Sequence, residues 1–111
     1  MREILTAAEA GESRALIALK TYCYRIRKYI GAYVAAMGGL DAVVFTGGVG
    51  QGSDMVRALA LQGLDCMGIR LDEQLNRDAR GFDEVCRIST NDSKVSVLVV
   101  QVRGNQVSVL G

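Results

Sequence analysis

Helical and strand-like segments alternate along this chain, and that alternation predicts an α/β layer structure. The pattern holds one long run of apolar residues at helical spacing and stretches rich in strand formers at Val43–Thr46, Cys86–Ser89 and Lys94–Val102. At 111 residues the chain has an ordinary size for one domain, 1–111. A chain of this length can bury roughly 60 to 68% of its unfolded surface in a single core.

Two helices are predicted before the first strand. Residues 1–10 predict a short helix that Gly11 closes. A longer helix is predicted over Ser13–Met37, ended by Gly38 and Gly39, because its apolar residues recur every three or four positions. The stripe consists of Leu16, Leu19, Cys23, Ile26, Ile30 and Tyr33. Further apolar residues flank it, so this helix is either deeply buried or shared between a sheet and a partner subunit.

Short elements are predicted after the first strand. Ser53 is a suitable N-cap for a helix over Met55–Met67, which Gly68 closes. A brief strand at Ile69–Leu71 follows.

The rest of the chain predicts one more helix and a strand pair. Asp72 is expected to cap a short helix over Glu73–Ala79. The valine-rich stretch Lys94–Val102 is typical of a strand covered on both faces. The sequence Arg-Gly-Asn at 103–105 predicts a hairpin turn between that strand and a last strand at Gln106–Leu110.

The charge of the chain does not indicate binding to nucleic acid. The chain has 13 basic and 12 acidic residues and a net charge of +1. Its basic cluster is Arg25, Arg27 and Lys28, interleaved with Tyr24 and Tyr29. At helical spacing these side chains scatter around the axis, so they are interpreted as a solvated face. We therefore expect a partner recognised by shape, and no nucleic acid.

Cysteine usage and the N-terminus favour an intracellular setting. The three cysteines, Cys23, Cys66 and Cys86, lie in apolar surroundings, and the chain has no histidine. We expect reduced core cysteines rather than a zinc site. Residues 1–10 lack the apolar segment of a secretory signal, and no apolar run reaches the length of a membrane span. A cytoplasmic location, with no membrane partner, is the default expectation.

The glycine-rich segment is the strongest candidate for a ligand site. It reads VVFTGGVGQGS over Val43–Ser53. Glycine puts no Cβ between its amides and a ligand, and the helix that follows begins with unpaired N–H groups and a positive dipole end. Nucleotide phosphates bind to both features. The alternative is a strand-to-helix turn that binds nothing.

Two common nucleotide signatures do not fit this segment. A Walker loop requires a lysine after its last glycine, and none occurs here. A dinucleotide fingerprint would use Gly48 and Gly50 but requires a third glycine where Ser53 stands. The segment therefore belongs to neither class.

Four segments in register carry a resemblance to a known family. They read YRIRKYIGAY at 24–33, GGLDAVVFTGGVG at 38–50, MGIRLDEQLN at 67–76 and RISTNDSKVSVLVV at 87–100. In sequence and order they closely resemble the C-terminal domain of acetate kinases and of the related propionate kinases. The similarity covers residues 1 to about 100, and those enzymes are several times longer than this chain.

The resemblance implies a ribonuclease H-like domain of the acetate and sugar kinase, Hsp70 and actin superfamily, truncated to one domain. In that family ATP phosphorylates acetate reversibly to acetyl phosphate, with Mg²⁺ bridging the phosphates. By similarity, Gly48 and Gly50 match glycines of the adenosine loop, and Arg2, with Met1 as its apolar neighbour, matches an arginine beside the nucleotide. We expect weak binding of ATP or ADP. The expected cofactor-binding residues are Arg2, Gly47, Gly48, Val49, Gly50, Gly52 and Ser53.

Two departures from the family pattern bear on function. The family loop continues with glutamate, asparagine and serine where this chain has Gln51, Gly52 and Ser53, so a contact to the adenine is missing. Relatives also carry a glutamate that helps to hold Mg²⁺ after their last core strand, and then a final helix. No Asp or Glu follows Asp92 here, so no metal ligand is assigned and the tail, 101–111, is divergent.

Two hypotheses follow for the function of the chain. In the family, the N-terminal half supplies the acetate pocket and the arginine, histidine and aspartate groups around the transferred phosphoryl group. This chain has no counterpart of that half, so no catalytic residue is assigned and the chain alone is expected to be inactive. It is either a nucleotide-binding domain that a separate N-terminal half completes, or a non-catalytic assembly module that forms a homodimer through Ser13–Met37.

Overall fold

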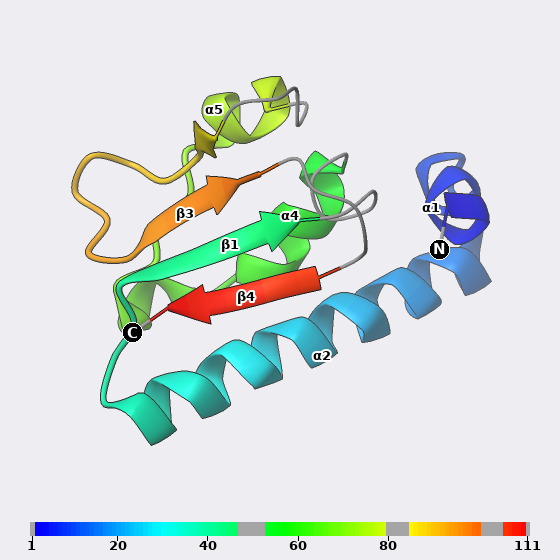
Figure 1. Ribbon diagram of the computed structural model, residues 1–111. Coiled ribbons are helices and arrows are strands. Elements are labelled where there is room, and N and C mark those ends of the chain that lie inside the picture. Colours follow the sequence, from blue (N-terminus) through cyan, green and yellow to red (C-terminus); the bar gives the residue numbers. More distant parts are fainter. Residues whose placement is uncertain (1, 47–52, 80–84, 101–105, 111) are drawn as a thin grey trace.

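The computed structural model describes residues 2–46, 53–79, 85–100 and 106–110 of the chain (Figure 1). The elements, in chain order, are α1 (Arg2–Glu9), α2 (Ser13–Met37), β1 (Ala42–Thr46), α4 (Asp54–Leu61), the 3₁₀ helix η1 (Leu64–Met67), α5 (Glu73–Asp78), β2 (Cys86–Arg87), β3 (Ser96–Val99) and β4 (Gln106–Leu110). Helices alternate with strands of one sheet, so the predicted α/β class is confirmed.

The strands lie in the order β2-β3-β1-β4. β1 and β3 run parallel, with Val43 opposite Val97 and Phe45 opposite Val99. β2 is antiparallel to β3, and β4 is antiparallel to β1. The two parallel strands therefore end at the same edge of the sheet.

The tail forms the predicted strand but pairs with a different neighbour. β4 lies against β1, with Ala42 opposite Leu110 and Thr46 opposite Gln106, so a hairpin with the preceding strand is wrong. The reason is that β2 already occupies the far edge of β3, and the free edge of the sheet belongs to β1. The predicted turn at 103–105 lies outside the described residues.

The helix predicted over Met55–Met67 is broken into α4 and η1. Gly63, with φ +78°, takes a left-handed conformation that reverses the helical path before η1 begins. Gly68, with φ +83°, closes η1, and a Cβ there would lie 3.0 Å from the Cβ of Lys94. One left-handed glycine, Gly63, thus interrupts a segment that its apolar spacing predicts to be continuous, while Gly68 closes it as predicted.

Several predicted strands are shorter in the structure. The segment Ile69–Leu71 contributes only an isolated bridge between Leu71 and Ser89. β2 covers two residues and β3 covers four. Within β3 the valines are buried while Leu98 is half-buried, and no described helix crosses in front of the strands in Figure 1. The expectation that this strand is covered on both faces is therefore wrong for its second face.

The predicted bounds of α2 and the predicted start of α5 are confirmed. α2 spans Ser13–Met37, and the Glu12 carboxylate accepts hydrogen bonds from the amides of Arg14 and Ala15 at its start. The Asp72 carboxylate accepts from the amide of Leu75 at 3.0 Å and caps α5.

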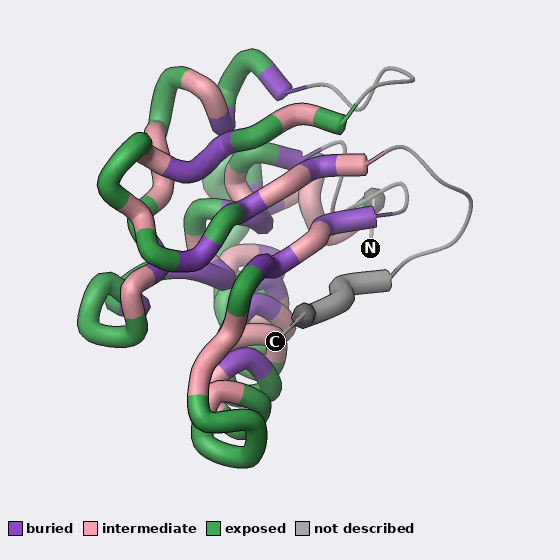
Figure 2. The backbone as a smooth tube through the Cα atoms, turned by 60° about the vertical axis from the view of Figure 1, so that its left-hand side comes forward, coloured by how far each residue is buried: buried purple, intermediate pink, exposed green. Residues whose placement is uncertain are grey.

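The core lies between the helices and one face of the sheet. α4 lies behind the strands in Figure 1, and Figure 2 shows buried stretches along both parallel strands. The largest apolar side chains of this core are Leu19, Ile30, Phe45, Ile69 and Ile88.

α2 is not deeply buried. Its buried residues are Ala15, Leu19, Cys23 and Ile30, but it also exposes large apolar side chains. These are Ile17, Tyr24, Tyr29, Tyr33 and Met37. Deep burial of this helix is therefore wrong. The alternative, that α2 is shared between the sheet and a partner subunit, stays a prediction.

Candidate functional site

The carboxyl end of β1 is the place where the fold converges on the predicted ligand segment. β1 ends at the buried Thr46, and α4 begins at Asp54. Figure 1 places α1 at this end of the sheet. In open α/β sheets, ligands bind outside the carboxyl ends of parallel strands.

Ser53 prepares the first turn of α4. Its Oγ accepts a hydrogen bond from the amide of Val56 at 3.1 Å, and its backbone is extended, as an N-cap requires. The side chain is buried, with 4% of its surface exposed. The predicted cap is confirmed, and α4 begins at a capped N-terminus.

The other predicted site residues are not tested by the structure. Gly47, Gly48, Val49, Gly50 and Gly52 lie outside the described residues. For Arg2 the structure describes the backbone, which begins α1 at the same end of the sheet, but not the side chain. The assignment of these residues to a nucleotide stays a prediction.

A buried arginine links α4 to α5 immediately behind this N-terminus. Arg57 is 0% exposed; its Nε donates to Oδ1 of Asn76 at 2.6 Å, and its Nη2 donates to the carbonyl oxygens of Asn76 at 2.7 Å and Ala79 at 3.1 Å. Burial lowers the pKa of Arg57 to about 10, while the Asp54 carboxylate acts to raise it. The guanidinium is therefore charged at neutral pH.

Sequence reasoning did not single out Arg57 or Asn76. The available signal was a basic residue inside the apolar run Met55–Leu61, at a position where helical spacing predicts burial. Asn76 has no such signal, because an asparagine in a short polar helix is usually solvated.

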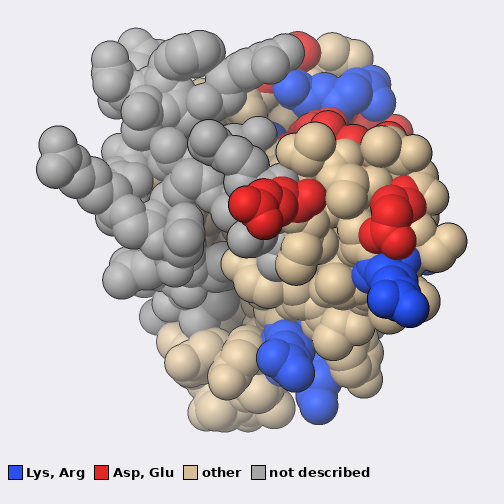
Figure 3. Space-filling view, turned by 90° about the vertical axis from the view of Figure 1, so that its right-hand side faces the viewer, with Lys and Arg blue, Asp and Glu red and all other residues tan. Residues whose placement is uncertain are grey.

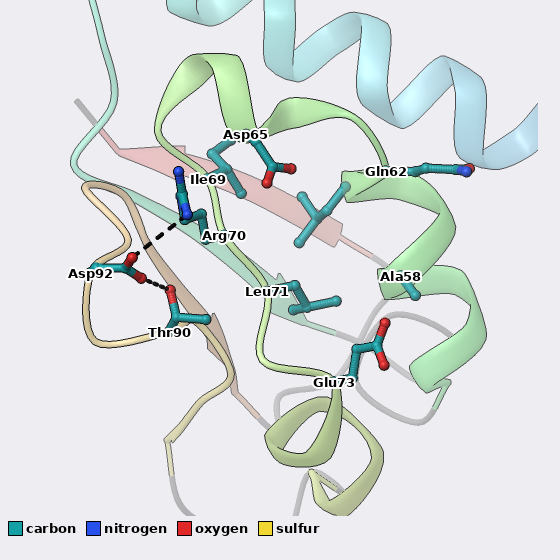
Figure 4. Close-up of a pocket in the computed structure, with 10 residues that line it drawn as sticks. Ala58, Gln62, Asp65, Ile69, Arg70, Leu71, Glu73, Thr90 and Asp92 are labelled. Atoms are coloured by element: carbon teal, nitrogen blue, oxygen red, sulfur yellow. Dashed lines mark hydrogen bonds and ion pairs between the residues drawn. The ribbon is translucent and has the colours of Figure 1, made fainter.

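A hollow of about 520 Å³ opens beside the carboxyl-terminal half of α4 (Figure 4). It is lined by Ala58, Leu61, Gln62, Asp65, Ile69, Arg70, Leu71, Glu73, Thr90 and Asp92. At its rim an exposed ion pair joins Arg70 and Asp92 at 3.6 Å. A hydrogen bond from Thr90 lowers the pKa of Asp92. Ser53, the predicted site residue whose side chain the structure describes, is not among these lining residues.

Metal ligands are not gathered in the described part of the chain. There, no group of three or more His, Cys, Asp or Glu side chains could hold an ion. On the face seen in Figure 3, the described basic and acidic side chains are interspersed. The expectation that the partner is recognised by shape rather than by charge stays a prediction.

The cysteines are free, but they are not all in the core. Cys23 is buried, Cys86 is half-buried and Cys66 is exposed. The expected core position is thus wrong for Cys66, because η1 carries it onto the surface. No helix in the part of the chain described here is long and apolar enough to cross a membrane.

Known kinases share this fold and this sequence. The model superimposes on the crystal structures of acetate kinase from Porphyromonas gingivalis (TM-score 0.82, 46% identity) and from Entamoeba histolytica (TM-score 0.81, 30% identity), covering 90% of this chain in each case and 25% and 26% of those chains. A propionate kinase from Francisella tularensis matches with a TM-score of 0.76 at 28% identity, over 92% of this chain and 25% of that one.

The sequence comparison names the family. The Acetokinase family model matches residues 1–109, so the chain belongs to the acetokinase family. Acetate kinase from Bacteroides thetaiotaomicron is 49% identical over 100 residues, which are 90% of this chain and 25% of the relative. The chain therefore spans about a quarter of the length of the curated relatives that it matches.

Proposed function

We propose that this chain is the nucleotide-binding, C-terminal domain of an acetate kinase-like protein, with a ribonuclease H-like fold, and that it binds the adenosine part of ATP or ADP. The observation that carries the proposal is a capped helix N-terminus at Ser53, on the helix that follows β1 in the chain, in a sequence 49% identical to an acetate kinase. Helix N–H groups and dipole favour an anionic phosphate at such a place.

The residues fit a nucleotide better than a metal ion. Ser53 and the first turn of α4 provide the helix terminus, and we propose that Arg2 and the loop residues Gly47, Gly48, Val49, Gly50 and Gly52 complete the cofactor site. Relatives use Mg²⁺ with ATP, but the sequence after Asp92 contains no carboxylate to hold it. We therefore propose nucleotide binding that does not depend on Mg²⁺.

Phosphoryl transfer needs groups that this sequence does not contain. The reaction depends on positioning and on neutralising charge around the transferred group, and this chain has no histidine. We propose that the chain alone is inactive as a kinase and that a separate N-terminal half, holding the carboxylate substrate, would complete the enzyme.

Calorimetry tests the binding proposal. The chain is titrated with ATP, ADP and adenosine, each with and without Mg²⁺, and we expect weak heats that Mg²⁺ leaves unchanged. Gly48→Val should reduce them, because the added side chain would intrude on the ligand. Gly31→Ala is the matched control, since that Cβ would lie inside α2 at an ordinary 3.6 Å from the Cε of Met67. Absence of heat at saturating nucleotide would reject the proposal.

The exposed side chains of α2 support a second candidate, a non-catalytic assembly module. Tyr29, Tyr33 and Met37 follow one another at intervals of four and lie in a line, with 68%, 47% and 46% of their surfaces exposed. Exposed apolar stripes of this kind mark protein interfaces. In this alternative the chain forms a homodimer through Ser13–Met37, and nucleotide binding is vestigial.

Light scattering distinguishes this candidate from a monomeric domain. A dimer mass that the double variant Tyr29→Glu/Tyr33→Glu converts to a monomer would support it. Asn91→Glu adds one negative charge, against two in the double variant, at an exposed site outside α2 and is the control. A wild-type monomer at millimolar concentration would refute the dimer.

A further inference from the structure

The side chain of Asn76 hydrogen-bonds to two parts of α4. Its Oδ1 accepts the hydrogen bond from Arg57, while its Nδ2 donates to the carbonyl oxygen of Asp54 at 3.0 Å. Asp54 is the first residue of α4 and follows the cap Ser53 directly. One buried amide, 3% exposed, therefore connects the beginning of α4 to the middle of the same helix and to α5.

The Arg57–Asn76 contact consists of directional hydrogen bonds, although apolar packing alone would hold α4 against the core. Burying a guanidinium is costly, and replacing buried charges by apolar side chains is often neutral or stabilising. Val56, Ala60 and Leu61 already pack α4 into the core. Hydrogen bonds add what apolar contacts lack, because their geometry fixes the rotation and the axial position of the helix.

The fixed position matters at one end of the helix. The Asn76 amide acts on Asp54, and Arg57 lies one turn further along; its backbone N–H donates to the carbonyl oxygen of Ser53 at 3.3 Å. Together these contacts hold the beginning of α4, at Asp54, and the residue one turn beyond it, Arg57. The far end, around Leu61, receives none of them in the described part of the chain.

We propose that Asn76 and Arg57 are positioning residues for the nucleotide: they hold the start of α4, the helix that follows β1 in the chain, in one orientation. Neither side chain touches the ligand. The inference rests on the proposed function for the identity of the ligand, but the orientation of the helix turn is a property of the free protein.

The variant Asn76→Asp distinguishes the hydrogen bond to Arg57 from the hydrogen bond to the Asp54 carbonyl. The carboxylate keeps an acceptor for Arg57 and adds an opposite charge, but it has no N–H to donate to the Asp54 carbonyl and sets oxygen against oxygen. We expect its melting temperature to be at or above that of the control variant Leu75→Ala. Its Kd for ADP should be about tenfold higher than that of the wild type, as loss of one buried hydrogen bond implies. Backbone amides of residues 54–58 should exchange faster with solvent.

Leu75→Ala is the matched control. Leu75 is a half-buried neighbour on α5 whose truncation lowers stability without removing a contact to Asp54. A merely structural role for Asn76 would make affinity follow stability in both variants. If Asn76→Asp binds ADP as Leu75→Ala does, or if amides 54–58 exchange at the wild-type rate, the inference is wrong.

Two further results are informative. If Asn76→Asp does not fold, Arg57→Lys takes its place; it keeps the charge but loses the forked donors, and the same loss of ADP affinity is expected. If the wild type binds no nucleotide, the proposed function fails while amide exchange still decides the positioning. Faster exchange at 54–58 would then support the helix contact alone, and unchanged exchange would overturn it.

Discussion

The thiol of Cys23 donates a hydrogen bond to the carbonyl oxygen of Val56 at 3.6 Å and so joins α2 to α4 inside the core. Burial raises the pKa of this thiol to about 11, and the nearby Arg27 opposes the rise only in part. The thiol is therefore neutral at physiological pH, in contact with the same helix that carries the candidate site.

Cysteine reactivity should separate these environments. At pH 8 roughly one Cys23 thiol in a thousand would be ionised, given a pKa of about 11, and only the thiolate is reactive. We expect a disulfide reagent to modify Cys66 quickly and Cys23 only on unfolding, as mass spectrometry would show. Cys66→Ser removes the fast phase as a control. Rapid labelling of Cys23 in the folded chain would contradict this packing.

Alkaline pH should weaken the fold through Cys23. The folded pKa is raised from 9.0 to about 11, so the folded state holds the proton more tightly and stability is fully present below pH 9. As pH rises from 9 to 11 the unfolded state ionises first, and on the order of 2 kcal/mol is lost. Urea unfolding of wild type and Cys23→Ala at pH 9 and pH 11 measures this loss. The difference between their free energies of unfolding should be smaller at pH 11 than at pH 9. A constant gap would show that Cys23 does not titrate differently on folding.

A charge at the cap should distinguish phosphate from base recognition. Aspartate caps helices as well as serine does, so Ser53→Asp should change stability by less than about 1 kcal/mol. Its negative charge would repel a phosphate at the start of α4, so the affinity for ADP should fall while that for adenosine stays unchanged. Calorimetry with the two ligands makes the comparison. Equal losses for both would place the phosphates elsewhere.

Removal of the tail should expose a sheet edge. β4 pairs with all five residues of β1, which contains the buried Val43 and Phe45. A chain ending at residue 100 would present that edge to other molecules, and unpaired edges promote aggregation. We expect a lower melting temperature and larger species in sedimentation. A truncated chain as stable and monodisperse as the full chain would show that β4 contributes nothing.

Replacing a glycine inside α2 by alanine should raise the stability of the protein. Gly31 lies in the helix interior, where glycine costs roughly 0.5–1 kcal/mol relative to alanine. The added Cβ would meet only the Cε of Met67, at 3.6 Å. Gly31→Ala should therefore raise the free energy of unfolding by about that amount in urea titrations. A loss of stability would mean that α2 is packed more tightly at Gly31 than this distance implies.

Much of the fold was predictable because its signals are local. The caps Ser53 and Asp72 act on amides three residues away, and the run Ser13–Met37 carries the helical period over its whole length. Prediction was wrong where a local pattern was continuous but the backbone was not, as at Gly63. The loop residues and Arg2 are proposed from resemblance, and no contact of theirs is described.

By itself, the sequence determined the bounds of α2, the caps of α4 and α5, the α/β alternation and the family, since each depends on residue types at short spacings or on whole segments in order. Only the tertiary structure decided that β4 pairs with β1, that α2 leaves Tyr29 exposed, and that Arg57 is buried against Asn76. Those outcomes depend on contacts between residues far apart in the chain, 19 positions in the case of Arg57 and Asn76. Their free energy comes from burial and geometry that no local pattern contains.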